Sequence, residues 1–265
     1  MDLAVNHKID SRAVIHKGAE IDSDVSIGPY AVIGENVKIG RGTVIDAHAT
    51  IHGWTEIGEN CRISSGAVLG DAPQSYGYKG ERTYVRIGNN NIIREFVTVH
   101  RSAKEEETTR IGDDNFLMAY VHVGHDCLIG NQTTITSYVA IAGHVIIEDK
   151  AIIGGMTAIH QFVRLGTLSM TGGVSRAIKD VPPYFLASGN PTVIQGLNVV
   201  GLRRAGIKPE VRTNLKKAYH IIYRSGLNVT QAVQRIREEM EVKDEIAHLV
   251  QFIEESERGI CAGRK

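Results

Sequence analysis

Large aliphatic residues recur at every sixth position along most of the chain. The series covers residues 3–69, 87–99 and 111–165 and keeps one phase across both interruptions. A small or β-branched residue often lies two positions before each member, as at Ala31 and Val139. An α-helix has a period near 3.6 residues and does not produce this spacing, whereas short β-segments joined by tight corners do. The pattern predicts a rod of stacked β-coils with the large aliphatic side chains inside.

Glycine often follows the large aliphatic residue, as at Gly28 and Gly130. Because glycine lacks a Cβ, it adopts backbone geometries that other residues resist, and we expect these glycines to form the corners. If three hexapeptides make one triangular coil, positions three hexapeptides apart in sequence stack directly above one another. Neighbouring coils would then lie about 4.8 Å apart.

Two interruptions and a change of pattern divide the chain. Loops are expected near residues 71–85 and 102–109, where the repeat is broken; the first is a candidate functional loop, and the second, which is short and charged, is read mainly as a solvated loop. The β-rod is predicted to occupy residues 1–191. Residues 192–265 carry helical apolar spacing, with Pro209 suited to a first helical turn and Gly226 to a helix end. They predict a helical domain, which could simply cover the open end of the rod.

The composition favours one compact chain with no strong overall charge. The 265 residues include 30 Lys and Arg and 30 Asp and Glu, so no bulk field attracts nucleic acid or a membrane. No apolar run reaches the roughly 18 residues of a membrane span, and residues 1–10 do not resemble a secretion signal. The three cysteines, Cys61, Cys127 and Cys261, are far apart and are interpreted as reduced core residues. A cytoplasmic protein is expected.

The segment VHVGHDCLIG, residues 121–130, holds the chemistry-bearing residues at the centre of the rod. Counting three hexapeptides per coil, His125, Gly143 and Gln161 form one column, and Asp126 and His144 form the next. His160 lies one place to the other side, and His122 precedes His125 within the same coil. The count predicts that these side chains converge on one corner: His122, His125, Asp126, His144, His160 and Gln161.

Two kinds of chemistry fit such a corner. Clustered imidazoles bind zinc, and a histidine oriented by a carboxylate, here His125 with Asp126, serves as a general base. Gly143 beside His125 adds a backbone N–H that no side chain covers, which could meet a developing oxyanion.

Several motifs together resemble one family of bacterial enzymes. PQSYGYKGE, NNNIIREFVTVHR, VHVGHDC, AGHV, IIGGMTAIHQF, DVPPY and GLRR are similar to the UDP-N-acetylglucosamine O-acyltransferases that begin lipid A synthesis. The resemblance covers nearly the whole chain. It implies a left-handed parallel β-helix and a cytoplasmic homotrimer with active sites between subunits. It also implies a reaction without a cofactor or metal, in which acyl carrier protein delivers a 3-hydroxyacyl thioester to a nucleotide sugar.

The resemblance also implies roles for individual residues. His125 would be the general base, oriented by Asp126, and the Gly143 N–H would stabilise the oxyanion. Gly173 and Met170 match positions that control acyl length, and the glycine implies a long 3-hydroxyacyl chain. Residues matching positions that hold the substrate are Gln74, Ser75, His122, His144, His160, Gln161, Asn198 and Arg204.

The chain departs from the family pattern in the first loop. Relatives commonly read Gln-Asp-Leu-Lys where this chain has Gln74, Ser75, Tyr76 and Gly77. A carboxylate only accepts hydrogen bonds, whereas a serine hydroxyl also donates them, so a 3-amino analogue of the sugar is an alternative acceptor. Two readings from other classes also stay open: a metal-dependent β-helix hydratase of the carbonic anhydrase type, and a non-catalytic trimeric scaffold.

Overall fold

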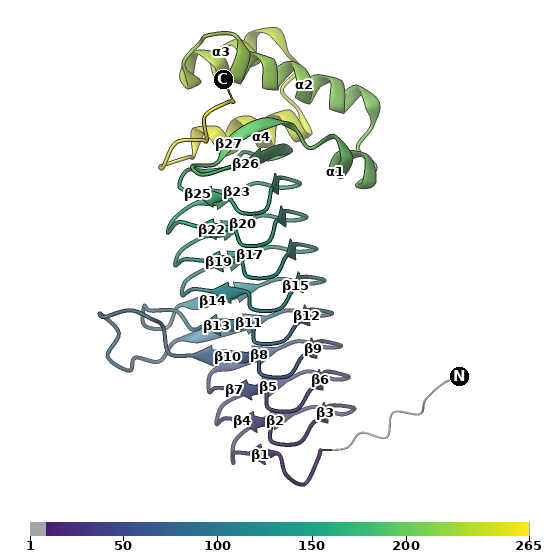
Figure 1. The fold of residues 1–265 in the computed structure, drawn as a ribbon, viewed down its shortest axis with the longest axis vertical. Helices are drawn as coiled ribbons and strands as arrows, with labels where there is room; N and C mark the ends of the chain where they lie inside the picture. Colours follow the sequence, from purple (N-terminus) through teal and green to yellow (C-terminus); the bar gives the residue numbers. More distant parts are fainter. Residues whose placement is uncertain (1–8, 265) are drawn as a thin grey trace.

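The structure, a computed structural model, describes residues 9–264; Leu3, the first position of the repeat, lies outside them. From Val14 to Ala177 the strands form a left-handed parallel β-helix in which every third strand belongs to the same sheet. The three sheets are the sides of a triangular rod, and helices sit at its C-terminal end (Figure 1). The fold predicted from the six-residue period and the family resemblance is confirmed.

The strands are short and are assigned here by sheet. Sheet I contains β1 (Val14–Ile15), β4 (Val32–Ile33), β7 (Thr50–Ile51), β10 (Val68–Asp71), β13 (Thr98–His100), β16 (His122–Val123), β19 (Ala140–Ile141), β22 (Ala158–Ile159) and β25 (Arg176–Ala177). Sheet II contains β2 (Glu20–Ile21), β5 (Lys38–Ile39), β8 (Thr55–Ile57), β11 (Tyr84–Ile87), β14 (Thr108–Ile111), β17 (Leu128–Ile129), β20 (Ile146–Ile147) and β23 (Arg164–Leu165). Sheet III contains β3 (Ser26–Ile27), β6 (Val44–Ile45), β9 (Arg62–Ile63), β12 (Ile92–Ile93), β15 (Phe116–Leu117), β18 (Thr134–Ile135), β21 (Ile152–Ile153), β24 (Met170–Thr171), β26 (Phe185–Ser188) and β27 (Val193–Leu197).

The register advances by one coil every three hexapeptides through the central third of the rod. His122 pairs with Ala140, and Ala140 pairs with Ala158. In the two-residue strands the second residue points inward, so side chains such as Ile135 and Ile141 are fully buried. Each such side chain contributes roughly 1.5–3 kcal/mol by leaving water, and this repeated burial holds the coils in phase.

The glycines after the large aliphatic residues serve a purpose other than the one expected. The left-handed backbone conformation falls two positions later, at residues such as Tyr30 (φ 59°) and Asn60 (φ 54°). A Cβ on Gly28 would lie 2.7 Å from the Ala47 nitrogen, and one on Gly40 would lie 2.7 Å from the Gly58 carbonyl carbon. These glycines therefore let successive coils approach closely, and the expectation that they provide special corner geometry was wrong.

Both loops leave the rod at the edge between sheets I and II, called here edge I/II. The first separates β10 from β11 and the second separates β13 from β14 (Figure 1). Strand pairing skips over each loop, because Val68 pairs with Thr98 and Thr98 pairs with His122. The first offset is five hexapeptide lengths and the second is four, in place of the regular three. Each loop is thus an insertion into one corner that leaves the coil above it in register.

A helical layer covers the last coil. The helices are α1 (Val199–Arg204), α2 (Pro209–Arg224), α3 (Val229–Glu239) and α4 (Asp244–Glu254). Pro209 opens α2, and Gly226, with φ +76°, follows its end. Strand β27 falls inside the segment predicted to be helical. It pairs antiparallel with β26 and so extends sheet III beyond the coils. Contacts between rod and helices include the Arg164 guanidinium over the Phe252 ring, 4.4 Å from its centroid.

The three cysteines are free and buried in the core, as the sequence predicts. Burial raises the pKa of the Cys127 thiol to about 12, so it stays protonated and unreactive at neutral pH. Within residues 9–264, none of the helices combines the length and the apolarity that crossing a lipid bilayer requires.

Candidate functional site

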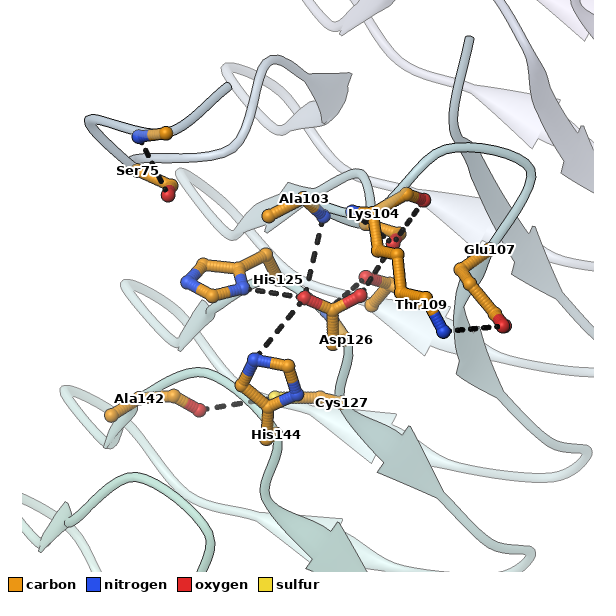
Figure 2. Close-up of polar contacts among 12 residues, drawn as sticks. Ser75, Ala103, Lys104, Glu107, Thr109, His125, Asp126, Cys127, Ala142 and His144 are labelled. Atoms are coloured by element: carbon orange, nitrogen blue, oxygen red, sulfur yellow. Dashed lines mark hydrogen bonds and ion pairs between the residues drawn. The ribbon is translucent and has the colours of Figure 1, made fainter. Parts of the chain in front are cut away.

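The site is built on the turn that joins β16 to β17 at edge I/II. His125 and Asp126 occupy this turn, with Asp126 in the left-handed region at φ 61°. This conformation directs the Asp126 carboxylate toward the His125 ring, and His125 Nδ1 lies 2.6 Å from Asp126 Oδ2 (Figure 2). Both side chains are mostly buried, at 16% and 11% exposure. The interaction expected from their adjacency in sequence is present.

Asp126 is fixed from several sides by the second loop and the coil below. The Ser102 hydroxyl donates to Oδ1 and the Ala103 N–H donates to Oδ2 at 3.3 Å. The Asp126 N–H donates to Thr109 Oγ1 at 2.8 Å. Burial opposes ionisation, but the hydrogen bonds from Ser102, His125 and Ala103, together with the attraction of His144, outweigh it and lower the pKa of Asp126. The carboxyl group is therefore ionised at neutral pH.

The ionised carboxylate determines which tautomer His125 adopts. A carboxylate can only accept hydrogen bonds, so the proton between the two side chains must be on His125 Nδ1. In the neutral ring the Nε2 atom then carries a lone pair and can accept a proton. This is the arrangement that a general base requires.

Gly143 and His144 complete the corner one coil above. A Cβ on Gly143 would lie 2.6 Å from His125 Cε1 and 2.8 Å from Nε2, so the imidazole rests directly against the glycine backbone. The Gly143 N–H donates no hydrogen bond to the described residues. His144 stacks on Phe162 with centroids 4.6 Å apart, and its Nε2 atom lies 3.5 Å from Asp126 Oδ2. The stacking predicted by counting hexapeptides is observed.

Two adjoining cavities open beside His125. The first, about 550 Å³, is lined by first-loop residues Gln74, Ser75, Tyr76 and Gly77, by Ala103 and Lys104, and by His125, Asp126, His144 and Gln161. The second, about 470 Å³, lies over sheet I and includes His100, His122, Gly143 and the small residues Ala140 and Ala158. Figure 2 shows Ser75 on the loop that overhangs His125. Polar groups therefore surround His125 on one side, and small apolar residues line the cavity on the other.

His160 lies at the same corner but joins the cluster least. Its side chain is exposed, its Nδ1 atom lies 3.1 Å from the Gln161 backbone oxygen, and it lines neither cavity. The substrate contact that the resemblance implies for His160 stays a prediction.

Sequence reasoning missed several contributors because they lie beyond the register breaks. His100 is 7% exposed and packs against His122 with ring centroids 5.2 Å apart. Burial, followed by repulsion from His100 and His125, lowers the pKa of His122 and favours its neutral form. The second loop is more than a solvated loop, since Ser102 is fully buried against Asp126. The strand offset of four hexapeptide lengths places Ser102 beside Asp126. It could have been counted from the sequence, because the six-residue repeat keeps the same phase on both sides of the second loop.

Four of the predicted residues lie away from the histidines. Asn198, Arg204 and Met170 line a separate cavity of about 630 Å³ over sheet III, and Gly173 lies at the edge between sheets III and I. Arg204 is exposed and makes no ion pair among residues 9–264. Asn198 is buried and caps α1: its Oδ1 accepts from the Gly201 N–H at 3.0 Å, and its Nδ2 donates to the Leu168 oxygen at 2.8 Å. Asn198 therefore positions the helix that carries Arg204.

Among residues 9–264, one group of side chains could hold a metal ion. Ligand atoms of His125, Asp126 and His144 lie within 4.8 Å of one another. Imidazole and carboxylate are suitable zinc ligands. The same geometry also describes a hydrogen-bonded histidine and carboxylate, so it does not choose between the two chemistries.

Replacing Gly143 by alanine is expected to lower the reaction rate about 10²-fold, because a displacement of the base by about 1 Å costs that much. The added Cβ would push the His125 ring, whereas the turn itself tolerates a side chain, since Gln161 occupies the same turn position one coil above. Steady-state kinetics and thermal unfolding measure the two effects separately. The loss should vanish in a His125→Ala background; a fully additive loss there would contradict this explanation.

The coils and the corner define the chain as a hexapeptide-repeat transferase. The family model described as bacterial transferase hexapeptide (six repeats) matches residues 36–71 and 108–143. The model described as Udp N-acetylglucosamine O-acyltransferase, domain 2, matches residues 180–261. The chain belongs to the UDP-N-acetylglucosamine O-acyltransferase family, which confirms the resemblance and the prediction of an acyltransferase.

Solved structures and curated relatives support this family membership. A UDP-N-acetylglucosamine acyltransferase from Bacteroides fragilis is 42% identical, with a TM-score of 0.94 over 96% of this chain and 99% of that one. The Francisella novicida enzyme is 40% identical, with a TM-score of 0.94 over 97% and 95%. An acyl-[acyl-carrier-protein]–UDP-N-acetylglucosamine O-acyltransferase of Burkholderia lata is 45% identical over 104 residues, which span 38% of this chain and 40% of the relative.

Proposed function

We propose that this chain transfers a long 3-hydroxyacyl group from acyl carrier protein to the 3-hydroxyl of UDP-N-acetylglucosamine, the first step of lipid A synthesis. The observation that carries the proposal is the His125–Asp126 pair, which leaves His125 Nε2 as a free base beside the Gly143 N–H. Family membership supplies the substrates, since the relatives' names state both the carrier protein and the nucleotide sugar. The buried free thiols are consistent with a reaction in the reducing cytoplasm.

The chemistry follows from these groups. The sugar hydroxyl gives its proton to His125 Nε2 as its oxygen attacks the thioester carbonyl carbon. The carbonyl oxygen becomes an oxyanion, which the Gly143 N–H stabilises. Collapse breaks the carbon–sulfur bond, and the departing thiolate takes the proton from the imidazolium. Asp126, held ionised by its hydrogen bonds, stabilises the imidazolium between these two steps.

Substrate positions follow from the two cavities beside the base. Gln74, Ser75, His144 and Gln161 line the polar one and would hold the sugar. His160 lies outside this cavity, so its contact with substrate is proposed from the family resemblance alone. His122, with Ala140 and Ala158, lines the other cavity, over sheet I. The acyl donor arrives on the phosphopantetheine of the carrier protein, so the proposed reaction uses no cofactor.

The remaining substrate-binding residues fit if the active site lies between subunits of a homotrimer. Arg204 and Met170 are on sheet III's side of the rod, while His125 is at edge I/II of the same chain. A neighbouring chain could bring them to the histidines. Arg204, exposed and without an acidic partner in residues 9–264, suits the nucleotide phosphates through its guanidinium donors. Met170 and Gly173 would then border the acyl chain.

Mass spectrometry of the product tests the proposal. Purified protein receives a mixture of 3-hydroxyacyl-carrier thioesters of different length together with the 3-hydroxy and the 3-amino nucleotide sugars. The expected product is an ester of a long acyl chain at the 3-oxygen. In Gly173→Met the preferred chain should be shorter, because the methionine side chain would take up room beside the proposed acyl chain. No acylated sugar of either kind would refute the proposal.

The 3-amino sugar stays an alternative because of Ser75. Its hydroxyl lies at the polar cavity and, among residues 9–264, accepts only a long hydrogen bond, 3.4 Å from the Gly77 nitrogen. A serine can accept from an ammonium or amine as well as donate to a hydroxyl oxygen. An amide product in preference to the ester, in the same experiment, would assign the chain to this alternative.

The metal-dependent hydratase is the second candidate, favoured by the grouping of His125, Asp126 and His144. It predicts bound zinc or iron and loss of activity on chelation. Acyl transfer that survives complete removal of metal, verified by elemental analysis, would exclude it.

A further inference from the structure

One arginine holds the first loop on both sides of its tip, residues 73–77, called here the loop tip. Arg101 directly follows β13, the strand one coil above the start of the loop. Its Nη1 atom donates to the Gly70 oxygen at 2.9 Å, and its Nη2 atom donates to the Tyr78 hydroxyl at 3.1 Å. Gly70 precedes the loop tip and Tyr78 follows it. A single side chain therefore joins the two ends of the segment that overhangs the site.

The backbone around Arg101 adds to this attachment. The Arg101 N–H donates to the Asp71 oxygen at 2.9 Å, and His100 Nδ1 lies 2.6 Å from the Ala72 oxygen. Because a carbonyl oxygen only accepts hydrogen bonds, His100 carries a proton on Nδ1 and donates it there. Gly70 lies at a register shift between β10 and β13 and has a φ of +77°. The chain thus leaves the rod in one defined conformation.

The Arg101 guanidinium is surrounded by neutral groups. It lies over the Trp54 ring, 5.4 Å from the centroid, and over the Tyr78 ring, 5.9 Å from the centroid. Among residues 9–264 it forms no ion pair, and its Nε atom is buried without a hydrogen-bond partner. Arginine presents several donors in one plane and also packs on aromatic rings. Its contacts here connect Trp54, in the turn between β7 and β8, with both ends of the loop tip.

The loop tip has no hydrogen bond of its own to the rod. Within the described part of the chain, the hydrogen bonds of residues 73–77 stay inside the first loop. Tyr76 is fully exposed. Gln74 and Ser75 nevertheless line the polar cavity beside His125 (Figure 2). The position of these two side chains therefore depends on where the ends of the loop tip are held.

We propose that Arg101 is a positioning residue for acyl transfer, which fixes the first loop so that Gln74 and Ser75 meet the sugar beside His125. The role in the reaction rests on the proposed function, whereas the attachment of the loop does not. Arg101 lines neither cavity beside His125, so it acts through the loop tip. A loop that is already held in place loses less conformational freedom when the sugar binds.

Replacing Arg101 by methionine tests the role in the reaction, because methionine keeps an extended side chain and removes the donors. KM for the nucleotide sugar should rise about tenfold, the change that a loss of roughly 1.4 kcal/mol in binding produces. The value of kcat should stay close to that of the wild type, since Asp126 keeps its hydrogen bonds from Ser102 and Ala103. Arg110→Met is the control: Arg110 is exposed on sheet II, lines neither cavity beside the histidines, and should leave both constants unchanged.

Trypsin cleavage after Lys79 measures the attachment itself. Lys79 is exposed in the first loop, and cleavage of such a segment follows how often it opens. Cleavage should be faster in Arg101→Met than in the wild type or in Arg110→Met. Tyr78→Phe removes the hydroxyl that Arg101 Nη2 contacts and should give an intermediate rate. It tests the same contact if thermal unfolding shows that Arg101→Met does not fold.

A combined variant shows whether Arg101 acts through the loop tip. In a protein that already carries Gln74→Ala and Ser75→Ala, adding Arg101→Met should raise KM for the nucleotide sugar little further, because the side chains that it positions are gone. A further tenfold rise in this background would mean that Arg101 acts by another route, and the positioning role would be wrong.

The remaining outcomes separate the attachment from the catalytic proposal. Unchanged cleavage in both Arg101→Met and Tyr78→Phe overturns the attachment. Faster cleavage with an unchanged KM for the nucleotide sugar overturns the positioning role. If cleavage changes as expected and the wild type acylates no sugar, the attachment of the loop stands and the proposed function fails.

Discussion

Replacing His125 by alanine should lower kcat for acyl transfer by about 10³-fold, within the range that general-base catalysis contributes. The loss should appear in kcat more than in KM, because Nε2 acts on the proton that moves during the reaction. The other groups of the corner remain in place, since Asp126 keeps its hydrogen bonds from Ser102 and Ala103. Steady-state kinetics with saturating carrier thioester measures the effect.

His220→Ala provides the control, because this histidine is exposed on α2 and lies in neither cavity. It should leave both kinetic constants unchanged. A His125→Ala protein with kcat within a factor of about three of the wild type, with the fold verified by thermal unfolding, would be too active for His125 to be the base. The same result is what a non-catalytic scaffold predicts for the chain's function.

Mixing two inactive variants should restore activity if the site lies between chains. His125→Ala and Arg204→Ala subunits, co-expressed with different tags, form mixed trimers with one intact interface each. The doubly tagged fraction, which contains only mixed trimers, should then have about a third of the wild-type number of sites. Activity of the doubly tagged fraction, compared with each variant alone, measures this recovery.

The matched control mixes His125→Ala with Asp126→Asn. Both substitutions damage the same half of the proposed site, since the two side chains are hydrogen-bonded to each other. No mixed interface is then intact, and no recovery is expected. Equal recovery in both mixtures, or none in either, would show that His125 and Arg204 do not meet across a subunit boundary.

The six-residue period carried enough information to predict the coil and much of the corner. Uninterrupted repeats between residues 111 and 165 allowed His125 to be stacked under Gly143 by counting alone. The structure places that glycine backbone directly against the imidazole. Inward-facing aliphatic residues fix this register physically, because a slip would expose a whole column of buried side chains.

Other contacts were not evident because they depend on folded loops and side-chain packing. His100 and Ser102 reach the site across the widened strand pairing of the second loop, on a segment whose charge favoured a solvated loop. The amide of Asn198 caps α1 through Oδ1 and donates through Nδ2 to the Leu168 oxygen, contacts that the sequence did not indicate, and its contact with the nucleotide stays a prediction. The six-residue period predicts the position of the backbone in each coil. It does not predict which polar groups a side chain will hydrogen-bond.

Both insertions depart from one corner and return to the same phase, and this gives the architecture a modular character. The strands on either side of the first loop still pair in order, Val68 with Thr98 and Val85 with Thr109. Lengthening or replacing such an excursion would leave the aliphatic columns untouched. New sugar preferences would therefore arise by exchanging surface segments, while His125 and Asp126 keep their inherited geometry.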